Sequence, residues 1–284
     1  MPDIAETLAN AAAILAFAEI ADSRREAVSL LCFALGRDRA FLIAHPEYAL
    51  NADEAAFFIS ILKRRADREP FHHITGVKEF YGLDFQVSRD VLIPRPETEM
   101  LVARSIEMLT GKHDSTFCEV GVGSGCIAIS ALWHLPVASA VGLDISETAI
   151  ALARRNAESH DVVDRYELLV SDVYSALGPK RFDLIVSNPP YVPIEDIAGL
   201  QREVRDFEPH LALTDGGNGL SVIEKIVHQS PAYLKPGGSV VIEIGTNQAK
   251  AVNAMFDAKV WANVEIVPDF QGIPRMVCAG LILR

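Results

Sequence analysis

The sequence has few basic residues for its length, and this shortage disfavours the usual proteins that bind polyanions. Its 284 residues contain 26 Lys and Arg against 38 Asp and Glu, which gives a formal net charge of −12 at pH 7. Phosphate backbones and anionic lipid headgroups repel such a charge. A general nucleic-acid coat or a polybasic membrane binder is therefore disfavoured, although a local basic groove is compatible with the composition.

Cysteine is also scarce, and its spacing excludes the common metal and redox motifs. The four cysteines are Cys32, Cys118, Cys126 and Cys278, and no two of them form a CxxC pair. No cysteine–histidine cluster has the spacing of zinc ligands, and the pair formed by His72 and His73 has no third ligand in view. We therefore expect no metal site, and we expect buried free thiols in a reducing compartment.

Long apolar runs are missing as well. The most apolar early run covers residues 11–18 and is cut short by Glu19, so it is too short to cross a bilayer. The first six residues carry acids where a signal peptide would carry a basic stretch. These features predict a cytoplasmic protein without a membrane segment.

The chain changes character near residue 80. Residues 5–70 nearly lack glycine, and their apolar residues recur at helical intervals. Asn51 is placed to cap a helix that Pro70 stops. Residues 80–96 alternate between apolar and polar, as in a hairpin or extended linker, and end in a stiff Pro-Arg-Pro. We predict a helical domain over residues 1–79, a hairpin linker over 80–96 and a larger domain over 97–284.

Short β-branched runs alternate with helical stretches throughout the larger domain. The expected strands cover 116–120, 140–143, 166–170, 184–187, 240–244 and 264–267, and helical patterns cover 126–134, 149–158 and 220–234. This alternation is typical of an α/β fold with a parallel, doubly wound sheet. The ligand of such a sheet binds at the carboxyl ends of the strands, near the topological switch point.

A glycine-rich loop follows the first expected strand. It reads Gly121-Val122-Gly123-Ser124-Gly125, and it lets the backbone approach a ligand at the start of a helix. The next expected strand ends at Asp144, whose carboxylate can accept both hydroxyls of a ribose. After the third strand, Asp172 could accept from the exocyclic amine of a purine while Val173 packs on the ring. These features indicate an adenosine-containing cofactor, either NAD or S-adenosylmethionine.

The residues at the end of the fourth expected strand distinguish between these two cofactors. It reads Ser187-Asn188-Pro189-Pro190-Tyr191, in which two prolines end the strand. The Asn188 side chain and the Pro189 carbonyl can then accept two hydrogen bonds from one –NH₂ group, while Tyr191 offers an aromatic face. A nitrogen held in this way can attack a sulfonium methyl in line, with catalysis by positioning and electrostatics. The sequence therefore predicts methyl transfer, because this motif has no role in hydride transfer.

The quoted motif resembles the signature of S-adenosylmethionine-dependent methyltransferases that act on planar –NH₂ groups. Other segments narrow the resemblance to the peptide chain release factor N5-glutamine methyltransferases, the PrmC/HemK family. These segments are residues 78–82 (KEFYG), 92–99 (LIPRPETE), 203–209 (EVRDFEP), 234–238 (LKPGG) and 267–275 (VPDFQGIPR). The match covers the catalytic domain and the linker, whereas the helical N-terminal domain fits in kind more than in sequence.

The resemblance implies a Rossmann-like class I methyltransferase sheet with a small N-terminal all-α domain, which we expect to dock the substrate protein. It implies that S-adenosyl-L-methionine is bound by Gly121, Val122, Gly123, Ser124, Gly125, Asp144, Val173 and Asn188. It also implies catalytic roles for Asn188, Pro189 and Tyr191, and that Asn188, Pro189, Pro190 and Tyr191 hold the glutamine of a release factor's Gly-Gly-Gln loop. Glu119-Val120-Gly121-Val122-Gly123 departs from the commoner Asp-Leu-Gly-Thr-Gly, which removes a threonine hydroxyl near the cofactor but keeps the glycines.

Other functions remain open from the sequence alone. The substrate could be a glutamine of a ribosomal protein, or the amino group of adenine or guanine in DNA or ribosomal RNA. The second alternative needs a basic surface for the polyanion, which the net charge of −12 disfavours, so we expect no direct nucleic-acid binding. A non-catalytic binding module or an NAD-dependent oxidoreductase would share the same fold. The roles of Arg95, Glu97 and Glu208 are not decided by the sequence.

Overall fold

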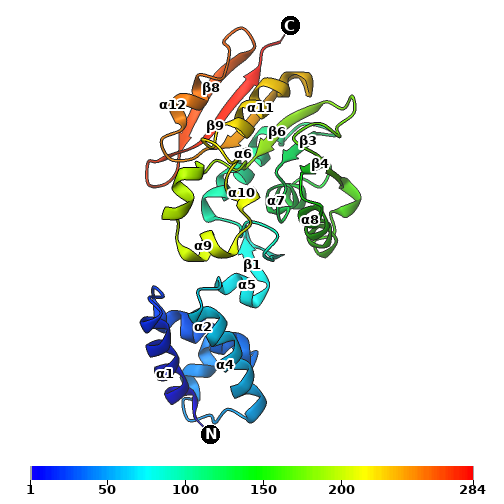
Figure 1. The fold of residues 1–284 in the computed structure, drawn as a ribbon. Coiled ribbons are helices and arrows are strands. Elements are labelled where there is room, and N and C mark those ends of the chain that lie inside the picture. Colours follow the sequence, from blue (N-terminus) through cyan, green and yellow to red (C-terminus); the bar gives the residue numbers. More distant parts are fainter. Residues whose placement is uncertain (1, 284) are drawn as a thin grey trace. The chain divides into compact units, whose positions relative to one another are not determined.

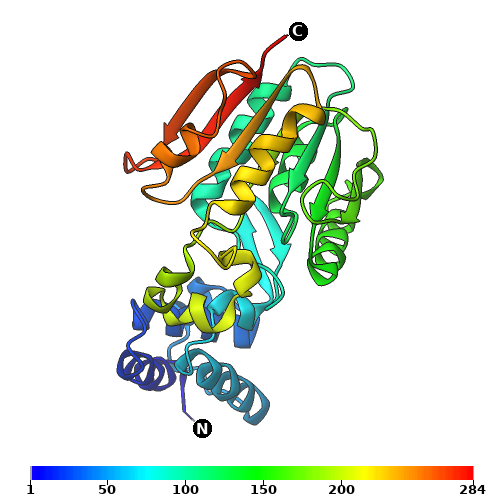
Figure 2. The same ribbon diagram turned by 45° about the horizontal axis from the view of Figure 1, so that its top comes forward.

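The computed structural model describes residues 2–283, and the chain divides into two compact units. The first unit contains residues 1–76 and 201–207, and the second contains residues 77–200 and 208–284. Both units are drawn in Figure 1 and Figure 2. The chain therefore passes from one unit to the other at three points along its length.

The first unit is helical. Its helices are α1 (Ile4–Phe17), α2 (Ser23–Leu35), α3 (Arg39–Ala44), α4 (Ala52–Ala66), α5 (Phe71–Thr75) and α9 (Arg202–Phe207). Helix α4 begins with a capping box, in which Asn51 Oδ1 accepts from the Glu54 amide and Glu54 Oε2 accepts from the Asn51 amide. Apolar side chains from α1, α2 and α4, including Leu15, Leu31 and Ile61, form the core of this unit.

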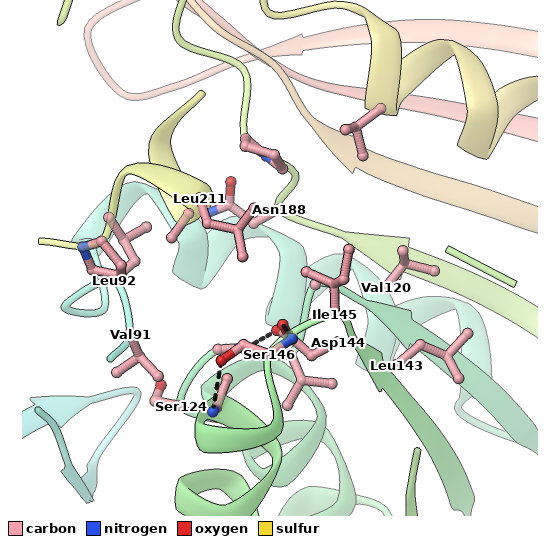
Figure 3. Close-up of a pocket in the computed structure, with 18 of the residues that line it drawn as sticks. Val91, Leu92, Val120, Ser124, Leu143, Asp144, Ile145, Ser146, Asn188 and Leu211 are labelled. Carbon is pink, nitrogen blue, oxygen red and sulfur yellow. Dashed lines mark hydrogen bonds between the residues drawn. The ribbon is translucent and has the colours of Figure 1, made fainter. Parts of the chain in front are cut away.

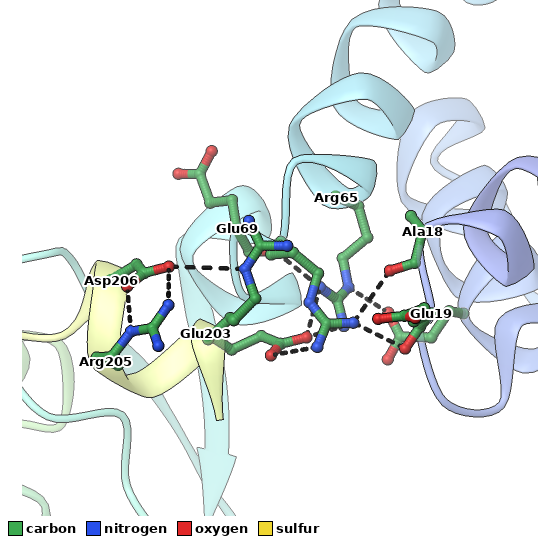
Figure 4. Close-up of polar contacts among 10 residues, drawn as sticks. Ala18, Glu19, Arg65, Glu69, Glu203, Arg205 and Asp206 are labelled. Atoms are coloured by element: carbon green, nitrogen blue, oxygen red, sulfur yellow. Dashed lines mark hydrogen bonds and ion pairs between the residues drawn. The ribbon is translucent and has the colours of Figure 1, made fainter. Parts of the chain in front are cut away.

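Two arginines on or just after α4 hold α9 within the helical unit. Arg65 Nη2 lies 3.3 Å from Glu203 Oε1, and Arg68 Nη2 lies 3.3 Å from Glu203 Oε2. Arg65 also donates from Nε to Glu26 Oε2 at 2.9 Å. Figure 4 labels Arg65 and Glu203 in this group of polar contacts. The sequence-based division at residue 79 differs from the observed one at residue 76, and it leaves out residues 201–207. Ion pairs between residues more than 130 positions apart leave no periodic trace in a sequence.

The second unit begins with a hairpin of β1 (Val77–Phe80) and β2 (Leu83–Gln86), so the hairpin starts before the expected residue 80. A sheet with the order β5-β4-β3-β6-β7-β9-β8 follows. Its strands are β3 (Thr116–Val120), β4 (Ser139–Asp144), β5 (Tyr166–Val170), β6 (Phe182–Ser187), β7 (Leu234–Glu243), β8 (Trp261–Pro268) and β9 (Pro274–Leu281).

The sheet is parallel from β5 to β7, and β9 then pairs antiparallel with both β7 and β8. The expectation of a parallel, doubly wound sheet is therefore confirmed for its central strands, whereas its last two strands form an antiparallel hairpin. The connection between β8 and β9 is too short for the crossover that a parallel pair requires.

Helices cover both faces of this sheet. The α-helices of the unit are α6 (Glu99–Leu109), α7 (Cys126–His134), α8 (Glu147–Ser159), α10 (His210–Leu213), α11 (Ser221–Gln229) and α12 (Ala249–Asn253). Short 3₁₀ turns are η1 (Pro96–Thr98), η2 (Val163–Arg165), η3 (Ile194–Gly199) and η4 (Ser230–Ala232). Helices α6, α7 and α8 pack with Phe117 on one face, and α11 and α12 pack with its neighbour Cys118 on the other. Successive strand residues thus enter different cores, as the pleat requires.

Candidate active site

A cavity of about 470 Å³ opens at the carboxyl ends of the parallel strands. In the sheet register, Val120 at the end of β3 pairs with both Leu143 of β4 and Ser187 of β6, so these strands end at the same edge. The order of the strands reverses at β3, which makes this edge the topological switch point of the sheet. Figure 3 shows labelled residues from three strand ends, Val120, Asp144 and Asn188, around this cavity.

Most of the residues that the sequence singled out line this one cavity. They are Gly121, Val122, Gly123, Ser124, Asp144, Asp172, Val173, Asn188 and Pro190. Gly125, Pro189 and Tyr191 are not part of its wall. Pro189 is buried and Tyr191 is half-buried. The cavity also has walls that the sequence did not indicate, from residues 89–95 on one side and 209–215 on another.

The glycine loop is held against the end of β4, because the amides of Gly121 and Val122 both donate to the Leu143 carbonyl, at 2.8 and 3.3 Å. Gly121, Gly123 and Gly125 all have positive φ. A Cβ at Gly125 would lie 2.8 Å from Ile129 Cδ1 and 3.2 Å from Ala153 Cβ, so the close approach of α7 and α8 requires glycine there. A Cβ at Gly123 would meet nothing within 4 Å, which leaves open space on the cavity side of the loop.

Asp144 joins this loop to the start of α8. Its Oδ2 accepts from the Gly123 amide and its Oδ1 accepts from the Ser146 amide, each at 2.9 Å. Ser146 caps α8 by accepting from the Ala149 amide. Burial raises the pKa of the Asp144 carboxyl, and the amides of Gly123 and Ser146 oppose that shift. The carboxylate can therefore help shape the loop and line the cavity at once.

The third strand is followed by a strained residue. Val173 has φ +49°, a conformation that costs a β-branched residue about 1–3 kcal/mol, and its side chain is buried. Ser171 stabilises the turn, because its Oγ donates to the Val173 carbonyl at 2.8 Å and accepts from the Ala176 amide at 3.0 Å. Lys225 Nζ of α11 lies 3.4 Å from Asp172 Oδ2 at the rim of the cavity.

Asn188 follows β6 directly, and a hydrogen bond to Thr98 orients its side chain. Ser187 Oγ donates to the Val120 carbonyl at 2.7 Å and ties the end of β6 to that of β3. Asn188 Nδ2 donates to Thr98 Oγ1 at 3.1 Å. Among residues 2–283, no group donates to Asn188 Oδ1, so this oxygen keeps its capacity to accept hydrogen bonds.

Tyr191 is held by a buried carboxyl group that the sequence analysis did not single out. Its hydroxyl donates to Glu243 Oε1 at 3.0 Å. A Cβ at Gly219, which has φ +75°, would lie 2.0 Å from the Tyr191 carbonyl oxygen, so only glycine fits. Gln248 Nε2 donates to the same carbonyl oxygen at 2.8 Å. The available sequence signal was a charged residue, Glu243, inside the apolar run of an expected strand.

A second missed residue organises the loop before α11. Asp215 Oδ1 accepts from the Gly217 and Gly219 amides, and its Oδ2 accepts from the amide and hydroxyl of Ser221. These bonds lower the pKa of the Asp215 carboxyl to about 2 against the opposing effect of burial. The sequence signal for this loop was its run of Asp, Gly and Asn residues.

Arg95 and Glu208 connect two walls of the cavity. Arg95 Nη2 lies 2.6 Å from Glu208 Oε1, and the Glu208 side chain is buried. Burial raises the pKa of the Glu208 carboxyl, and the Arg95 guanidinium opposes that shift. The pair therefore braces residues 92–95 against residues 208–211. The sequence alone did not decide this role of Arg95 and Glu208.

Within residues 2–283, no group of three or more His, Cys, Asp or Glu side chains is placed to hold a metal ion. No helix in the same range has both the length and the apolarity to cross a membrane.

Comparison with known families matches both parts of the chain. Residues 6–76 match the PrmC N-terminal domain, and residues 98–202 match the methyltransferase small domain. Among solved structures, a methyltransferase from Pyrococcus furiosus superposes with a TM-score of 0.52 at 18% identity, covering 72% of this chain and 91% of that one. At that identity the likeness shows the fold alone, which is that of a methyltransferase domain.

Curated relatives match the chain over nearly its whole length. The release factor glutamine methyltransferase of Cereibacter sphaeroides is 42% identical over 277 residues, which are 98% of this chain and 98% of that protein. The enzyme of the same name from Geobacter sulfurreducens is 43% identical over 258 residues, 91% of this chain and 89% of that protein. The chain therefore belongs to the release factor glutamine methyltransferases, which are S-adenosylmethionine-dependent enzymes.

Proposed function

We propose that this protein methylates the side-chain amide nitrogen of the glutamine in the Gly-Gly-Gln loop of peptide chain release factors. The products would be N5-methylglutamine and S-adenosylhomocysteine. The observation that carries the proposal is the position of Asn188. Its side chain lines the same cavity as the glycine loop and Asp144, and its Oδ1 has no donor among residues 2–283.

The cavity fits S-adenosyl-L-methionine in the kinds of group that it offers. Gly121 to Gly125 would cradle the cofactor, Asp144 would accept from its ribose hydroxyls, and Val173 would lie beside its adenine. The open space above Gly123 and the cavity volume of about 470 Å³ support this placement. When bound, the cofactor supplies a methyl group on a positively charged sulfur.

The protein's contribution to the reaction is the orientation of the substrate amide. Asn188 Oδ1 and the Pro189 carbonyl would accept one hydrogen bond each from the glutamine –NH₂ group, with Pro190 keeping the turn rigid and Tyr191 beside the amide plane. These bonds would draw electron density onto nitrogen and direct its lone pair toward the methyl carbon. As the C–N bond forms, the C–S bond breaks and its electron pair stays on sulfur. The N-methylated, N-protonated amide is strongly acidic, so its proton can leave to water without a strong base.

We further propose that the helical domain docks the release factor. The sequence-based division assigned residues 1–79 to this domain and 80–96 to a linker. The match of residues 6–76 to the PrmC N-terminal domain supports a shared role within the family.

The proposal is tested by finding where label from the cofactor arrives. The full-length protein would be incubated with methyl-labelled S-adenosylmethionine and, in separate reactions, with release factor, ribosomal proteins or duplex DNA. Mass spectrometry should place the label on the Gly-Gly-Gln glutamine. Label on another protein or on DNA bases, with none on the release factor, would overturn the proposal.

Asn188→Ala should separate binding from catalysis in the same assay. We expect kcat to fall by roughly 10²-fold or more, with cofactor affinity within about tenfold, because the lost bond acts mainly in the transition state. An unchanged kcat with a raised KM would contradict the proposed activation of the amide.

A further inference from the structure

A line of hydrogen bonds runs from Asn188 into the interior of the catalytic unit and ends on Glu243. Asn188 Nδ2 donates to Thr98 Oγ1 at 3.1 Å, and Thr98 Oγ1 donates to Glu243 Oε2 at 2.8 Å. The other oxygen, Glu243 Oε1, accepts from the Tyr191 hydroxyl at 3.0 Å. Thr98 and Glu243 are each 2% exposed, so these groups depend on one another for their bonds.

The chemistry of each group sets the direction of every bond in this line. An ionised carboxylate has no proton and can only accept, so the single hydroxyl proton of Thr98 must point at Glu243. Thr98 Oγ1 can then only accept from Asn188. The carboxamide of Asn188 must therefore present Nδ2 to Thr98, which turns Oδ1 to the opposite side.

We propose that Glu243 is a positioning residue that acts through Thr98 to hold the Asn188 carboxamide with Oδ1, rather than Nδ2, offered to the substrate. This inference rests on the proposed role of Asn188 as an acceptor for the glutamine –NH₂ group. A carboxamide turned the other way would present a donor to the substrate nitrogen's own hydrogens, and the two groups would repel each other. Glu243 thus fixes the orientation of the Asn188 carboxamide, which the Asn-Pro-Pro-Tyr motif does not fix by itself.

The charge state of Glu243 makes the line sensitive to pH. Burial raises the pKa of its carboxyl to about 6, the Thr98 and Tyr191 hydroxyls and Arg275 of β9 oppose the shift, and Glu97 of η1 adds to it. Cys126 of α7 also interacts electrostatically with Glu243. Glu243 is therefore ionised at neutral pH and takes up a proton as the pH falls through about 6. Once protonated, Glu243 can donate to Thr98 Oγ1. The Thr98 hydroxyl can then donate to Asn188 Oδ1, which turns the Asn188 carboxamide over.

The test compares Thr98→Val with Thr98→Ser in the full-length enzyme, using release factor and S-adenosylmethionine. Valine keeps the shape of threonine without the hydroxyl, and serine keeps the hydroxyl. We expect Thr98→Val to lower kcat roughly 10- to 100-fold, with KM and cofactor affinity within about threefold, and Thr98→Ser to restore at least about half of kcat. Ser105→Ala is the matched control, because it removes another buried hydroxyl, which donates to the Leu101 carbonyl, and should leave kcat within about twofold.

Glu243→Gln adds a readout that a purely structural role would not move. The wild-type kcat should fall as the pH drops below about 6, whereas the Gln variant should be slow at every pH and lack this acidic limb. The reason is that the glutamine amide does not titrate, so it can donate to Thr98 at every pH. If Glu243→Gln does not give a folded protein by circular dichroism, the Thr98 pair decides the question alone.

The outcomes separate this inference from the proposed function. If Asn188→Ala is slow but Thr98→Val keeps the wild-type kcat, the inference is wrong and the proposed function stands. If Asn188→Ala itself keeps the wild-type kcat, both are wrong. A slow Thr98→Val variant that serine restores, together with loss of the acidic limb in Glu243→Gln, supports the inference.

Discussion

Glu119 is a buried carboxyl group that its surroundings keep protonated at neutral pH. Its Oε2 accepts from the Tyr166 hydroxyl at 2.6 Å and from the Ala128 amide at 3.2 Å. Within residues 2–283, its Oε1 has no hydrogen-bond partner. Burial raises the pKa of this carboxyl to about 8 against the opposing effect of its two hydrogen bonds. The Glu119 side chain thus reaches Tyr166 and the first turn of α7.

Glu119→Gln should flatten the dependence of stability on pH. The carboxyl has a higher pKa in the folded state than the unfolded value near 4.5, so its contribution is full below about pH 4.5 and is lost as the pH rises to about 8. The wild-type Tm should therefore fall across this window, and the neutral variant should lack that part of the fall. Calorimetry at several pH values measures this, with the exposed Glu158→Gln as the charge control. Parallel Tm curves for wild type and Glu119→Gln would refute the expectation.

Asp144 is expected to act on cofactor binding rather than on the chemical step. Its two oxygens accept from the Gly123 and Ser146 amides, which leaves further lone pairs for ribose hydroxyls. We expect Asp144→Ala to weaken S-adenosylmethionine binding by roughly 10- to 100-fold and Asp144→Asn by less, since asparagine keeps one acceptor oxygen. Titration calorimetry checks this. Unchanged affinity in the Ala variant would exclude the ribose contact.

At the scale of single elements, the ion pairs of Glu203 tie α9 to the end of α4. Glu203 is 18% exposed, and its partners Arg65 and Arg68 are 8% and 15% exposed, so these ion pairs are shielded from water. Loss of one partner from a buried ion pair leaves charges without compensation. The six residues of α9, none of them fully buried, cannot replace that interaction by apolar packing.

Glu203→Gln should therefore loosen α9 while the rest of the helical unit stays folded. We expect the amides of residues 201–207 to exchange hydrogen at least about tenfold faster, and those of α4 to change little. Hydrogen exchange with mass spectrometry measures both. Asp206→Asn is the control, because Asp206 pairs with Arg205 on the same short helix. Equal exchange in both variants would show that Glu203 does not hold the element.

At the scale of the whole molecule, the proposed docking role concerns the surface of the helical unit. Phe33 of α2 and Phe57 of α4 are 38% and 45% exposed, and their ring centroids lie 6.0 Å apart. Aromatic residues are enriched in protein–protein interfaces, so this pair is where we place the proposed docking contact. Ile59 is 62% exposed on α4, but two residues along a helix it faces a different side from Phe57.

Phe57→Ser should raise KM for intact release factor by roughly tenfold with kcat unchanged, because it removes docking contacts and no reacting group. A short Gly-Gly-Gln peptide should be methylated at the wild-type rate. Ile59→Ser should leave the methylation of both substrates unaffected. If Phe57→Ser has no effect on the intact protein, this face of the helical unit does not dock it.

Local patterns along the chain predicted much of the fold. The strands 116–120 and 166–170 and the helix 126–134 were predicted with the bounds that the structure shows, because apolar runs ended at glycine or polar residues. The helix expected over 220–234 ends at Gln229, where Pro231 allows only a 3₁₀ turn, and β7 already begins at Leu234. Strand β9 was not named, because its residues form a short buried run and do not alternate between buried and exposed positions.

By itself, the sequence determined the fold class, the glycine loop with its acid, and the Asn-Pro-Pro-Tyr motif, because each of these is written in residues that are close along the chain. Only the tertiary structure decided which side chains orient that motif. Thr98 and Glu243 stand 145 positions apart, yet their hydrogen bond is 2.8 Å long. The pairing of Glu203 with Arg65 and Arg68 was decided in the same way. Packing brings such partners together, and no spacing rule along a chain predicts contacts that depend on the whole fold.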